Sequence, residues 1–453
     1  MNSQNVVDSS QHNRQKEFIA LAYHHPALDP VIDRLFPDPS DNESVRHILD
    51  GVAWKQRLKI QQQYKDRESG INKHDDNTYC WFNHEFYLRM LGPERYFSQM
   101  ALLVENKVLN HSSFTTPFGE HPIYQLTSDD YLNGCTLSPI TIPRVIKKIE
   151  HYRQWKVKHY SLIENRMREH IAKNFCYIDM SELKFWTVWK KRFQARSKAN
   201  TQHPLTWDEY CICGYGCWKI ICRWNDASLT QRMDPLLIHS CTFGKRLHHP
   251  FTYLPSEIRA YILDQHGNPI RFTEFDLANS QPALFANMMV AKDPSIRNTV
   301  LIRMIEQYRI YEDLAGKKSI TRQEAKTEFL HFLYCMATSN AQDEFESFYG
   351  WPAIEARKLK SRDQDDDGKF ISFPDRHKIL AREMQRMESK IFKEIWQVLW
   401  TKGFVFLPVH DAVYAANLNR NAKKEVLALM KMILNQHMII NYKVKMELIR
   451  RCE

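Results

Sequence analysis

Three short stretches of this chain occur in an order that decides how the rest of it is interpreted. They are FDLANSQPALFA at 275–286, RQEAKTEFLHFLYC at 322–335 and PVHDAVY at 408–414. The first and the third each place an aspartate, Asp276 and Asp411, at the end of an apolar segment. Two carboxylates that can hold metal ions, with a cationic helix between them in the sequence, are the parts needed for phosphoryl transfer from a nucleoside triphosphate.

The two aspartates fall where the pattern predicts the ends of strands. Asp276 follows the β-compatible segment RFTEF, and His410-Asp411 lies between the apolar runs FVFLPV and AVYAA. This pattern predicts a strand that ends at Asp276 and a β-hairpin with His410 and Asp411 at its tip. A carboxylate in such a position suits Mg²⁺, which prefers hard oxygen ligands. The alternative interpretation is that Asp276 caps a helix and Asp411 is an ordinary turn residue.

The middle stretch is a helical sequence with two cations, an apolar residue and an aromatic residue at four-residue spacing. Arg322, Lys326, Leu330 and Tyr334 advance by about 40° per step at 3.6 residues per turn, so they lie along one slowly winding stripe. The two cations are suited to phosphates, and the apolar and aromatic residues to a base and a sugar. The alternative is a half-exposed helix in which Leu330 and Tyr334 belong to the core.

Composition narrows the class of protein. A chain of 453 residues is typical of two or three subdomains, and its 43% apolar residues are ample for buried cores. Only 13 residues are Gly, and neither GxGxxG nor GxxxxGK[ST] occurs, which argues against a Gly-rich Rossmann or P-loop protein. The net charge of +10 favours a polyanionic partner, nucleic acid first.

The N-terminal sequence and the cysteines bear on location. MNSQNVVDSSQHNRQ is polar, no run approaches 18 apolar residues, and the ten Cys do not form a short secreted-type framework. We therefore expect a cytoplasmic, reduced protein without a membrane partner.

Positive charge is concentrated in one segment. The stretch 143–173 has helical spacing and contains nine Lys or Arg against three Glu. A second basic-aromatic helix is expected at 183–198, with Trp186, Trp189 and Phe193 on one face. Clustered cations of this kind favour contact with a nucleic-acid backbone. The alternative is a solvated surface helix whose aromatic residues are ordinary core.

Taken together, the motifs resemble those of A-family DNA polymerases (the DNA polymerase I type) and of their relatives, the single-subunit phage-type RNA polymerases. Motif A of that family is an Asp often followed by Ser-Gln, motif B is Arg-x3-Lys-x3-[Phe/Met]-x3-Tyr-Gly, and motif C is His-Asp. This chain has, in the same order, Asp276 with Ser280-Gln281, then Arg322, Lys326, Leu330 and Tyr334, then His410-Asp411. Upstream, Gly244-Lys245-Arg246-Leu247 is similar to the family's Gly-Arg-Leu segment, and Gln385 and Glu388, in EMQRMESKIF before motif C, lie where the family has a Gln-bearing helix near the template. The resemblance covers about 240–453, and the motif order resembles that of a compact phage or mobile-element polymerase.

The resemblance implies a role for each matching residue. Asp276 and Asp411 would hold two Mg²⁺ ions. Arg322 and Lys326 would bind the phosphates of a nucleotide, and Lys326 could protonate pyrophosphate. The remaining matches would contact the nucleotide base or the primer–template, namely Leu330, Tyr334, Arg246, Gln385 and His410. Implied partners are a primer–template, deoxynucleoside triphosphates (or NTPs) and replication accessory proteins.

Departures from the family pattern bear on sugar choice. Two extra residues separate Asp276 from Ser280-Gln281, and Pro282-Ala283 stand where the family has a Glu that crowds out a ribose 2′-hydroxyl. Leu330 replaces Phe or Met, and Cys335 replaces Gly. A DNA-directed DNA polymerase is the first hypothesis. A single-subunit RNA polymerase or primase-like enzyme, and a non-catalytic nucleic-acid-binding protein with a degenerate palm, are the alternatives.

Two other patterns suggest metal sites and are interpreted otherwise. Asp363-x-Asp365-x-Asp367-Gly368 begins like an EF-hand loop, but Pro374 occupies the twelfth position, where Glu is needed. The Cys residues at 211–222 lack CxxC spacing, so buried thiols are favoured over zinc.

The expected fold is an α+β right-hand polymerase with an antiparallel-sheet palm, helical fingers and thumb, and a mostly helical N-terminal region. The expected parts are a disordered tail at 1–16, an N-terminal region of unknown role at 17–140, a basic thumb-like region at 141–235, and palm and fingers at 236–453.

Overall fold

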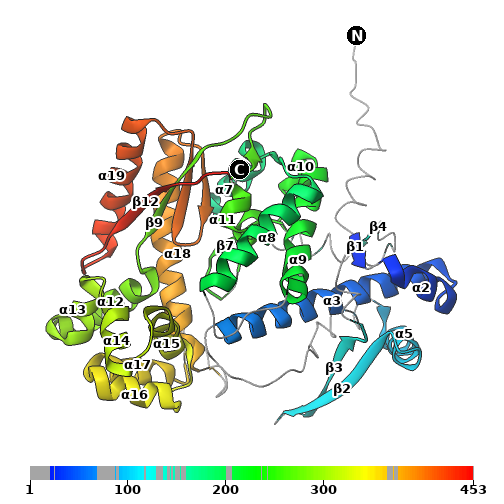
Figure 1. Ribbon diagram of the computed structural model, residues 1–453, viewed down its shortest axis with the longest axis horizontal. Coiled ribbons are helices and arrows are strands. Elements are labelled where there is room, and N and C mark those ends of the chain that lie inside the picture. The colour runs from blue at the N-terminus through cyan, green and yellow to red at the C-terminus, as the bar shows by residue number, and fades with distance from the viewer. Residues whose placement is uncertain are drawn as a thin grey trace. The chain divides into compact units, whose positions relative to one another are not determined.

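The structure is a computed structural model that divides into two compact units. The first unit is Met1–His159 with Tyr177–Leu236, and the second is Tyr160–Cys176 with Leu237–Glu453. The residues that it describes are 21–24, 26–68, 87, 91–116, 119–128, 136–139, 143, 146–147, 151, 154, 160–199, 207–235, 237–241, 243–364, 371 and 376–451. The fold is α+β, with many helices and small antiparallel sheets (Figure 1).

The first unit is built around one long helix, α3 (Pro39–Glu68). Its apolar residues Val45, Ile48 and Val52 are fully buried, and Tyr96 and Leu103 of α5 share the same core. The further helices of this unit are α2 (Asp29–Leu35), α5 (Pro93–Glu105), α8 (Glu182–Ala199), α9 (Trp207–Asp226), α10 (Leu229–Arg232) and the 3₁₀ helix η1 (Pro26–Leu28). Its strands are β1 (Leu21–His24), β2 (Leu109–Thr116), β3 (Gly119–Leu126), β4 (Thr136–Pro139) and β5 (Tyr177–Ile178), with β1–β4 and β2–β3 paired antiparallel.

The basic-aromatic helix predicted at 183–198 is α8, and its aromatic residues pack against α9. Trp189 donates from Nε1 to the carbonyl of Tyr210 at 2.9 Å, and the two rings lie 4.8 Å apart. Gly214 makes this approach possible, because a Cβ there would lie 2.7 Å from Trp186 and 2.8 Å from Trp189. These aromatic residues therefore form core, whatever the cations of α8 contact.

The second unit contains a four-stranded antiparallel sheet in the order β10-β11-β9-β12. Its strands are β9 (Phe272–Leu277), β10 (Phe406–Val409), β11 (Ala412–Ala416) and β12 (Val444–Leu448). Pro408, which cannot donate to a ladder, lies in the edge strand β10, as expected. Two buried histidines cover that edge, with His170 Nε2 2.9 Å from the carbonyl of Phe406 and His249 Nε2 2.5 Å from that of Pro408. The open edge is thereby closed to pairing with another strand.

Helix α18 (Lys378–Thr401) is the central helix of the second unit. It contacts α7, α12, α15, α17 and α19, and it buries Ile391, Ile395 and Leu399 (Figure 1). The other helices are α7 (Leu162–Asn174), α11 (Ser256–Arg259), α12 (Ser280–Lys292), α13 (Val300–Glu306), α14 (Ile310–Lys318), α15 (Arg322–Tyr334), α16 (Asn340–Tyr349), α17 (Trp351–Lys360), α19 (Arg420–His437) and the 3₁₀ helices η3 (Pro250–Tyr253) and η4 (Pro294–Asn298). Three short strands, β6 (His239–Ser240), β7 (Leu247–His248) and β8 (Ile262–Leu263), complete the unit.

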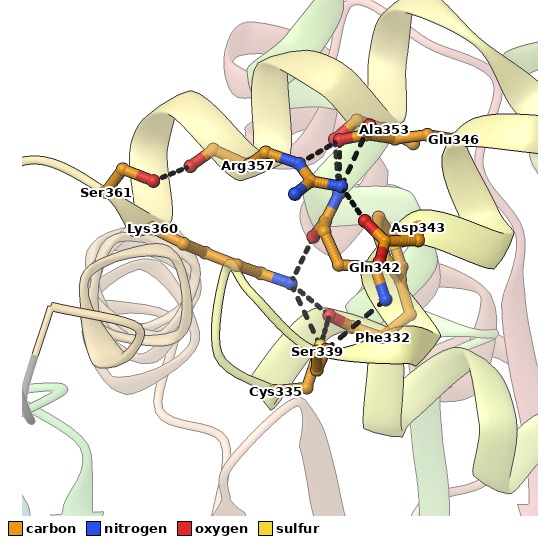
Figure 2. A network of polar contacts seen from close by, with 10 residues as sticks. All are labelled: Phe332, Cys335, Ser339, Gln342, Asp343, Glu346, Ala353, Arg357, Lys360 and Ser361. Carbon is orange, nitrogen blue, oxygen red and sulfur yellow. Dashed lines mark hydrogen bonds and ion pairs between the residues drawn. The ribbon is translucent and has the colours of Figure 1, made fainter.

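A buried lysine joins the three helices α15, α16 and α17 (Figure 2). Lys360 is 1% exposed, donates to the carbonyl of Phe332 at the end of α15, and donates to Gln342 Oε1 at 2.9 Å. Burial lowers the pKa of Lys360 to about 8. A charged group in such a place is tolerated because its donors are satisfied, and it ties α15 to its neighbours.

Several elements that the sequence predicts are present in the structure. The strand before Asp276, the hairpin around His410 and the helices after 280 are present. The region at 141–235 is divided between the two units, and its assignment as a thumb stays a prediction. The tail at 1–16 and most of 141–159 lie outside the described residues. Within the described ranges, no helix is both long and apolar enough to cross a membrane.

Candidate active site

The sheet of the second unit brings Asp276 of β9 next to Asp411 in the β10–β11 turn. Asp276 in β9 pairs with Ala412 at the start of β11, and Asp411 is the residue immediately before it. The Leu277 N–H donates to the carbonyl of Asp411 at 3.2 Å. His410 has the left-handed φ of 49° that the tight β10–β11 turn requires. Two carboxylates from segments about 135 residues apart in sequence therefore meet at one end of the sheet.

The surroundings of Asp276 at this end of the sheet disfavour the charged form of its carboxyl. Burial, then the negative charges of Asp411 and Glu274, raise the pKa of Asp276 to about 7. Lys445 opposes this effect and lies directly across from Asp276 in the β9–β12 register. Ser280, at the start of α12, donates from its hydroxyl to Asp411 Oδ2. The site thus concentrates negative charge that a cation would relieve.

A second pair of carboxylates lies two cross-strand rows further along the sheet. Glu274 of β9 pairs with Glu447 of β12 on one side and with Tyr414 of β11 on the other. Tyr414 donates from its hydroxyl to Glu274 Oε1 at 2.6 Å, and the guanidinium of Arg259 lies 4.6 Å from the Tyr414 ring centroid. The sequence alone did not identify Lys445 or these four residues, Glu274, Glu447, Tyr414 and Arg259, as part of the site. The alternation in NYKVKMEL places Lys445 and Glu447 on one face, but it does not say which strand lies opposite.

The donor set at this end of the sheet fits a hard divalent cation. Asp276 and Asp411 offer carboxylate oxygens, which Mg²⁺ prefers, and Mg²⁺ commonly takes few protein ligands and completes its shell with phosphate oxygens and water. No group of three or more His, Cys, Asp or Glu side chains that could hold a metal occurs among the described residues. The thiols of Cys211, Cys217 and Cys222 in α9 are half-buried and not fully buried as expected, within the described part of the chain. Most of the acidic loop at 363–374 lies outside it.

Neutral histidines lie beside the turn that carries Asp411. Burial, then Arg246 and His248, lower the pKa of His410 to about 4, and its ring contacts that of His248 at 5.4 Å. Burial lowers the pKa of His249 to about 3. At neutral pH the rings of His410 and His249 therefore add no positive charge that would neutralise Asp411.

The segment that resembles Gly-Arg-Leu lies against one face of α18. Gly244 lies close to Gln385, because a Cβ at Gly244 would be 2.6 Å from the Gln385 Cβ. Lys245 has a positive φ of 56°, and its carbonyl accepts from the Ser389 hydroxyl at 2.6 Å. Arg246 donates from Nη2 to Glu388 Oε2 at 2.6 Å. Arg246 and Gln385, both predicted to contact nucleic acid, thus lie in one neighbourhood.

Helix α15 contains the stripe of four residues, with Arg322 at its first position and Tyr334 at its last. Thr321 and Glu324 form a capping box that starts the helix at Arg322, and the helix ends at Tyr334. Tyr334 donates from its hydroxyl to Gln281 Oε1 at 2.6 Å, which links this end of α15 to α12. Gln281 is the neighbour of Ser280, so the start of α12 is joined both to Asp411 and to Tyr334.

The other end of α15 is not joined to the carboxylates. Arg322 donates to Glu312 Oε1 at 2.6 Å and lies over the Tyr311 ring at 5.3 Å. Lys326 is exposed and Leu330 is half-buried. Among the described residues, no hydrogen bond or ion pair connects these three residues to Asp276 or Asp411. Their proposed contacts with a triphosphate stay predictions.

Comparison with known proteins shows a distant structural likeness. No protein-family model and no curated protein matches the chain. Among solved structures, it is similar to the POL domain of Pol1 from M. smegmatis in complex with DNA primer-template and dNTP, with a TM-score of 0.41 and 11% sequence identity. The match covers 67% of this chain, and the chain spans 65% of the length of that structure. A likeness at this level establishes neither family nor activity, so function is inferred from the residues of the site.

Proposed function

We propose that this chain is a template-directed nucleotidyltransferase, and specifically a DNA-directed DNA polymerase that uses two Mg²⁺ ions. The observation that carries the proposal is the juxtaposition of three separated motifs. Asp276 of β9 lies beside the turn that carries Asp411, and Tyr334 of α15 donates to Gln281, whose neighbour Ser280 donates to Asp411. Sequence order alone would not require these residues to meet.

Each group has a defined part in the proposed reaction. Asp276 and Asp411 would hold the metal ions. When bound, these ions would lower the pKa of the primer 3′-hydroxyl and neutralise the charge of the triphosphate. Arg322 and Lys326 would move toward the phosphates, and Lys326 would give a proton to the leaving pyrophosphate. Tyr334 would face the base and sugar of the incoming nucleotide.

The groups beside the turn would handle nucleic acid. Arg246 and Gln385 would contact the primer–template, and the neutral ring of His410 would support the primer end. Leu330, half-buried on the same stripe as Tyr334, would pack against the nucleotide. Because Pro282-Ala283 replace the family's sugar-excluding Glu, the preferred sugar has to be measured.

The test is extension of a labelled DNA primer on a DNA template, with dNTPs and NTPs offered separately and with or without Mg²⁺. The informative variant is Asp411→Asn, which keeps the shape of the side chain. The matched control is Asp293→Asn, because Asp293 also accepts a hydrogen bond from a serine, Ser295 Oγ at 2.6 Å, and lies at the far end of α12.

We expect Mg²⁺-dependent extension by the wild type and by Asp293→Asn, and a loss of at least about a thousandfold in Asp411→Asn. The nucleotide that is used assigns DNA or RNA synthesis. Undiminished synthesis by Asp411→Asn would overturn the metal-binding role. Tight, salt-sensitive DNA binding without synthesis on any template would identify a binding protein instead.

A further inference from the structure

A buried glutamate outside the three motifs joins the segments that form the candidate site. Glu388 of α18 is 1% exposed, and its Oε2 accepts from Arg246 Nη2 at 2.6 Å and from Gln281 Nε2 at 3.0 Å. Gln281 in turn accepts at Oε1 from the Tyr334 hydroxyl at 2.6 Å. Four side chains from the 244–246 loop, α12, α15 and α18 therefore form one continuous chain of hydrogen bonds.

This arrangement is costly for the fold. Burying an ion pair removes hydration from both partners, and a well-packed apolar pair of the same volume is often as stable or more so. The cost here is not fully offset, because Glu388 Oε1 and Arg246 Nε are buried without a hydrogen-bond partner among the described residues. An apolar side chain at 388 would pack against α12 and α15 without that cost. The pair therefore has a use other than stability.

The geometry indicates what that use is. Arg246 is 19% exposed and flanks the turn that carries Asp411, whose charge acts on Arg246, Glu388 and Tyr334. A free arginine side chain has many rotamers, and one that donates to a buried carboxylate has few. The same carboxylate sets the amide orientation of Gln281, which leaves Oε1 to accept from Tyr334.

We propose that Glu388 is a positioning residue that holds Arg246 and, through Gln281, Tyr334 in fixed orientations beside Asp411. This inference rests on the proposed function, because it assigns Arg246 to the primer–template and Tyr334 to the nucleotide. Glu388 itself touches neither ligand. Its effect is to reduce the freedom that both side chains would lose on binding.

The experiment uses the full chain and three variants at the site, Glu388→Ala, Glu388→Gln and Arg246→Ala, with the double variant of Arg246→Ala and Glu388→Ala. The control is Glu346→Ala. Glu346 of α16 likewise accepts from one arginine, Arg357 Nε at 2.6 Å, and from one glutamine, Gln342 Nε2 at 3.0 Å, and it belongs to the network in Figure 2. Its loss removes the same kinds of contact from a place that is not joined to Asp411.

Two quantities are measured beside thermal stability. The first is the Kd for a fluorescein-labelled DNA hairpin primer–template, and the second is the KM and kcat for single-nucleotide incorporation. We expect Glu388→Ala to raise both Kd and the nucleotide KM by about tenfold or more and to change kcat by less than about threefold. Glu388→Gln, which can still accept from Arg246, restores more than half of the loss on a logarithmic scale. Glu346→Ala lowers stability but leaves Kd and KM within about twofold of the wild type.

The double variant shows whether Glu388 acts through Arg246. If it does, the double variant binds the hairpin no more weakly than Arg246→Ala alone, because coupled residues are not additive. Kd and KM within twofold of the wild type in Glu388→Ala, or additive losses in the double variant, would overturn the positioning role. A wild type that binds the hairpin but incorporates nothing would refute the proposed function, and the Kd comparison would still decide the role of Glu388.

Discussion

Replacing Asp276 with asparagine is expected to stabilise the protein at alkaline pH. In the folded chain the pKa of this carboxyl is raised from 3.8 to about 7, with burial as the largest cause and Asp411 next. A carboxyl whose pKa rises on folding binds more protons in the folded state than in the unfolded state between those two pH values. The free energy of unfolding therefore falls as the pH increases from about 4 to about 7 and is constant above that window. The asparagine side chain of the Asp276→Asn variant does not titrate, so the variant would not lose this stability.

The size of the effect follows from the shift. A shift of about three pKa units corresponds to about 4 kcal/mol at most. Asp276 is only partly buried, and solvent screening reduces what an exposed part of a charge contributes, so we expect about 2 kcal/mol. The difference between the Asp276→Asn variant and the wild type should be near zero at about pH 4 and complete at about pH 8.

Thermal unfolding at pH 5 and pH 8, each with and without Mg²⁺, measures this difference. A cation that binds only the folded state raises the wild-type Tm, so Mg²⁺ at pH 8 should stabilise the wild type more than the variant. Asp293→Asn is the control of opposite sign, because hydrogen bonds from Ser295 hold the pKa of the Asp293 carboxyl below its ordinary value. The reasoning is refuted if Asp276→Asn melts at or below the wild-type temperature at pH 8, or if its gain is the same at both pH values.

Three further changes test other parts of the second unit. Gly244→Ala would place a Cβ 2.6 Å from the Gln385 Cβ, so we expect the free energy of unfolding measured in urea to fall by about 1–3 kcal/mol. Adding Gln385→Ala to the same chain should restore part of that loss. A double variant no more stable than Gly244→Ala would contradict this explanation. Lys360→Met removes the amine that donates to the carbonyl of Phe332 and to Gln342 Oε1 and should cost about 1–3 kcal/mol by the same measurement, and a more stable variant would contradict the role of this lysine. Lys326→Ala should slow single-nucleotide incorporation by about tenfold or more with stability within about 0.5 kcal/mol, since this lysine is exposed; unchanged incorporation would remove it from the proposed mechanism.

The position of Asp276 at the end of a strand and that of Asp411 in a hairpin turn were accessible from the sequence, because each depends on local pattern. The β-compatible segment RFTEF precedes Asp276, the apolar runs FVFLPV and AVYAA flank His410-Asp411, and a hairpin needs only neighbouring segments. The start of α15 at Arg322 was accessible for a similar reason, since Thr321 and Glu324 are a capping-box pair three residues apart. In each case the deciding contacts span a few residues.

The contacts of Glu388 and Lys445 were not accessible in this way. Glu388 reaches Gln281 across 107 residues, and the contact depends on how α18 packs against α12. Lys445 lies opposite Asp276 only because β12 pairs with β9 and not with β10. The alternation of residues along a strand sets which side chains share a face, but strand order is decided by the packing of the whole unit. Patterns in a single sequence reveal neither the packing of α18 against α12 nor the order of the strands.

The distribution of unfavourable electrostatics in the second unit is itself an argument about function. Away from the two aspartates, buried polar side chains have a structural use, since His170 and His249 cover the open edge of β10 and Lys360 joins α15 and α16. At the candidate site the opposite holds, because burial raises the pKa of Glu388 as well as that of Asp276 to about 7. Selection for stability alone would replace such groups with apolar or neutral residues. Carboxylates at the end of a sheet and beside a half-buried arginine have a use when they bind a cation or orient another side chain, and those are the roles proposed for Asp276 and Glu388.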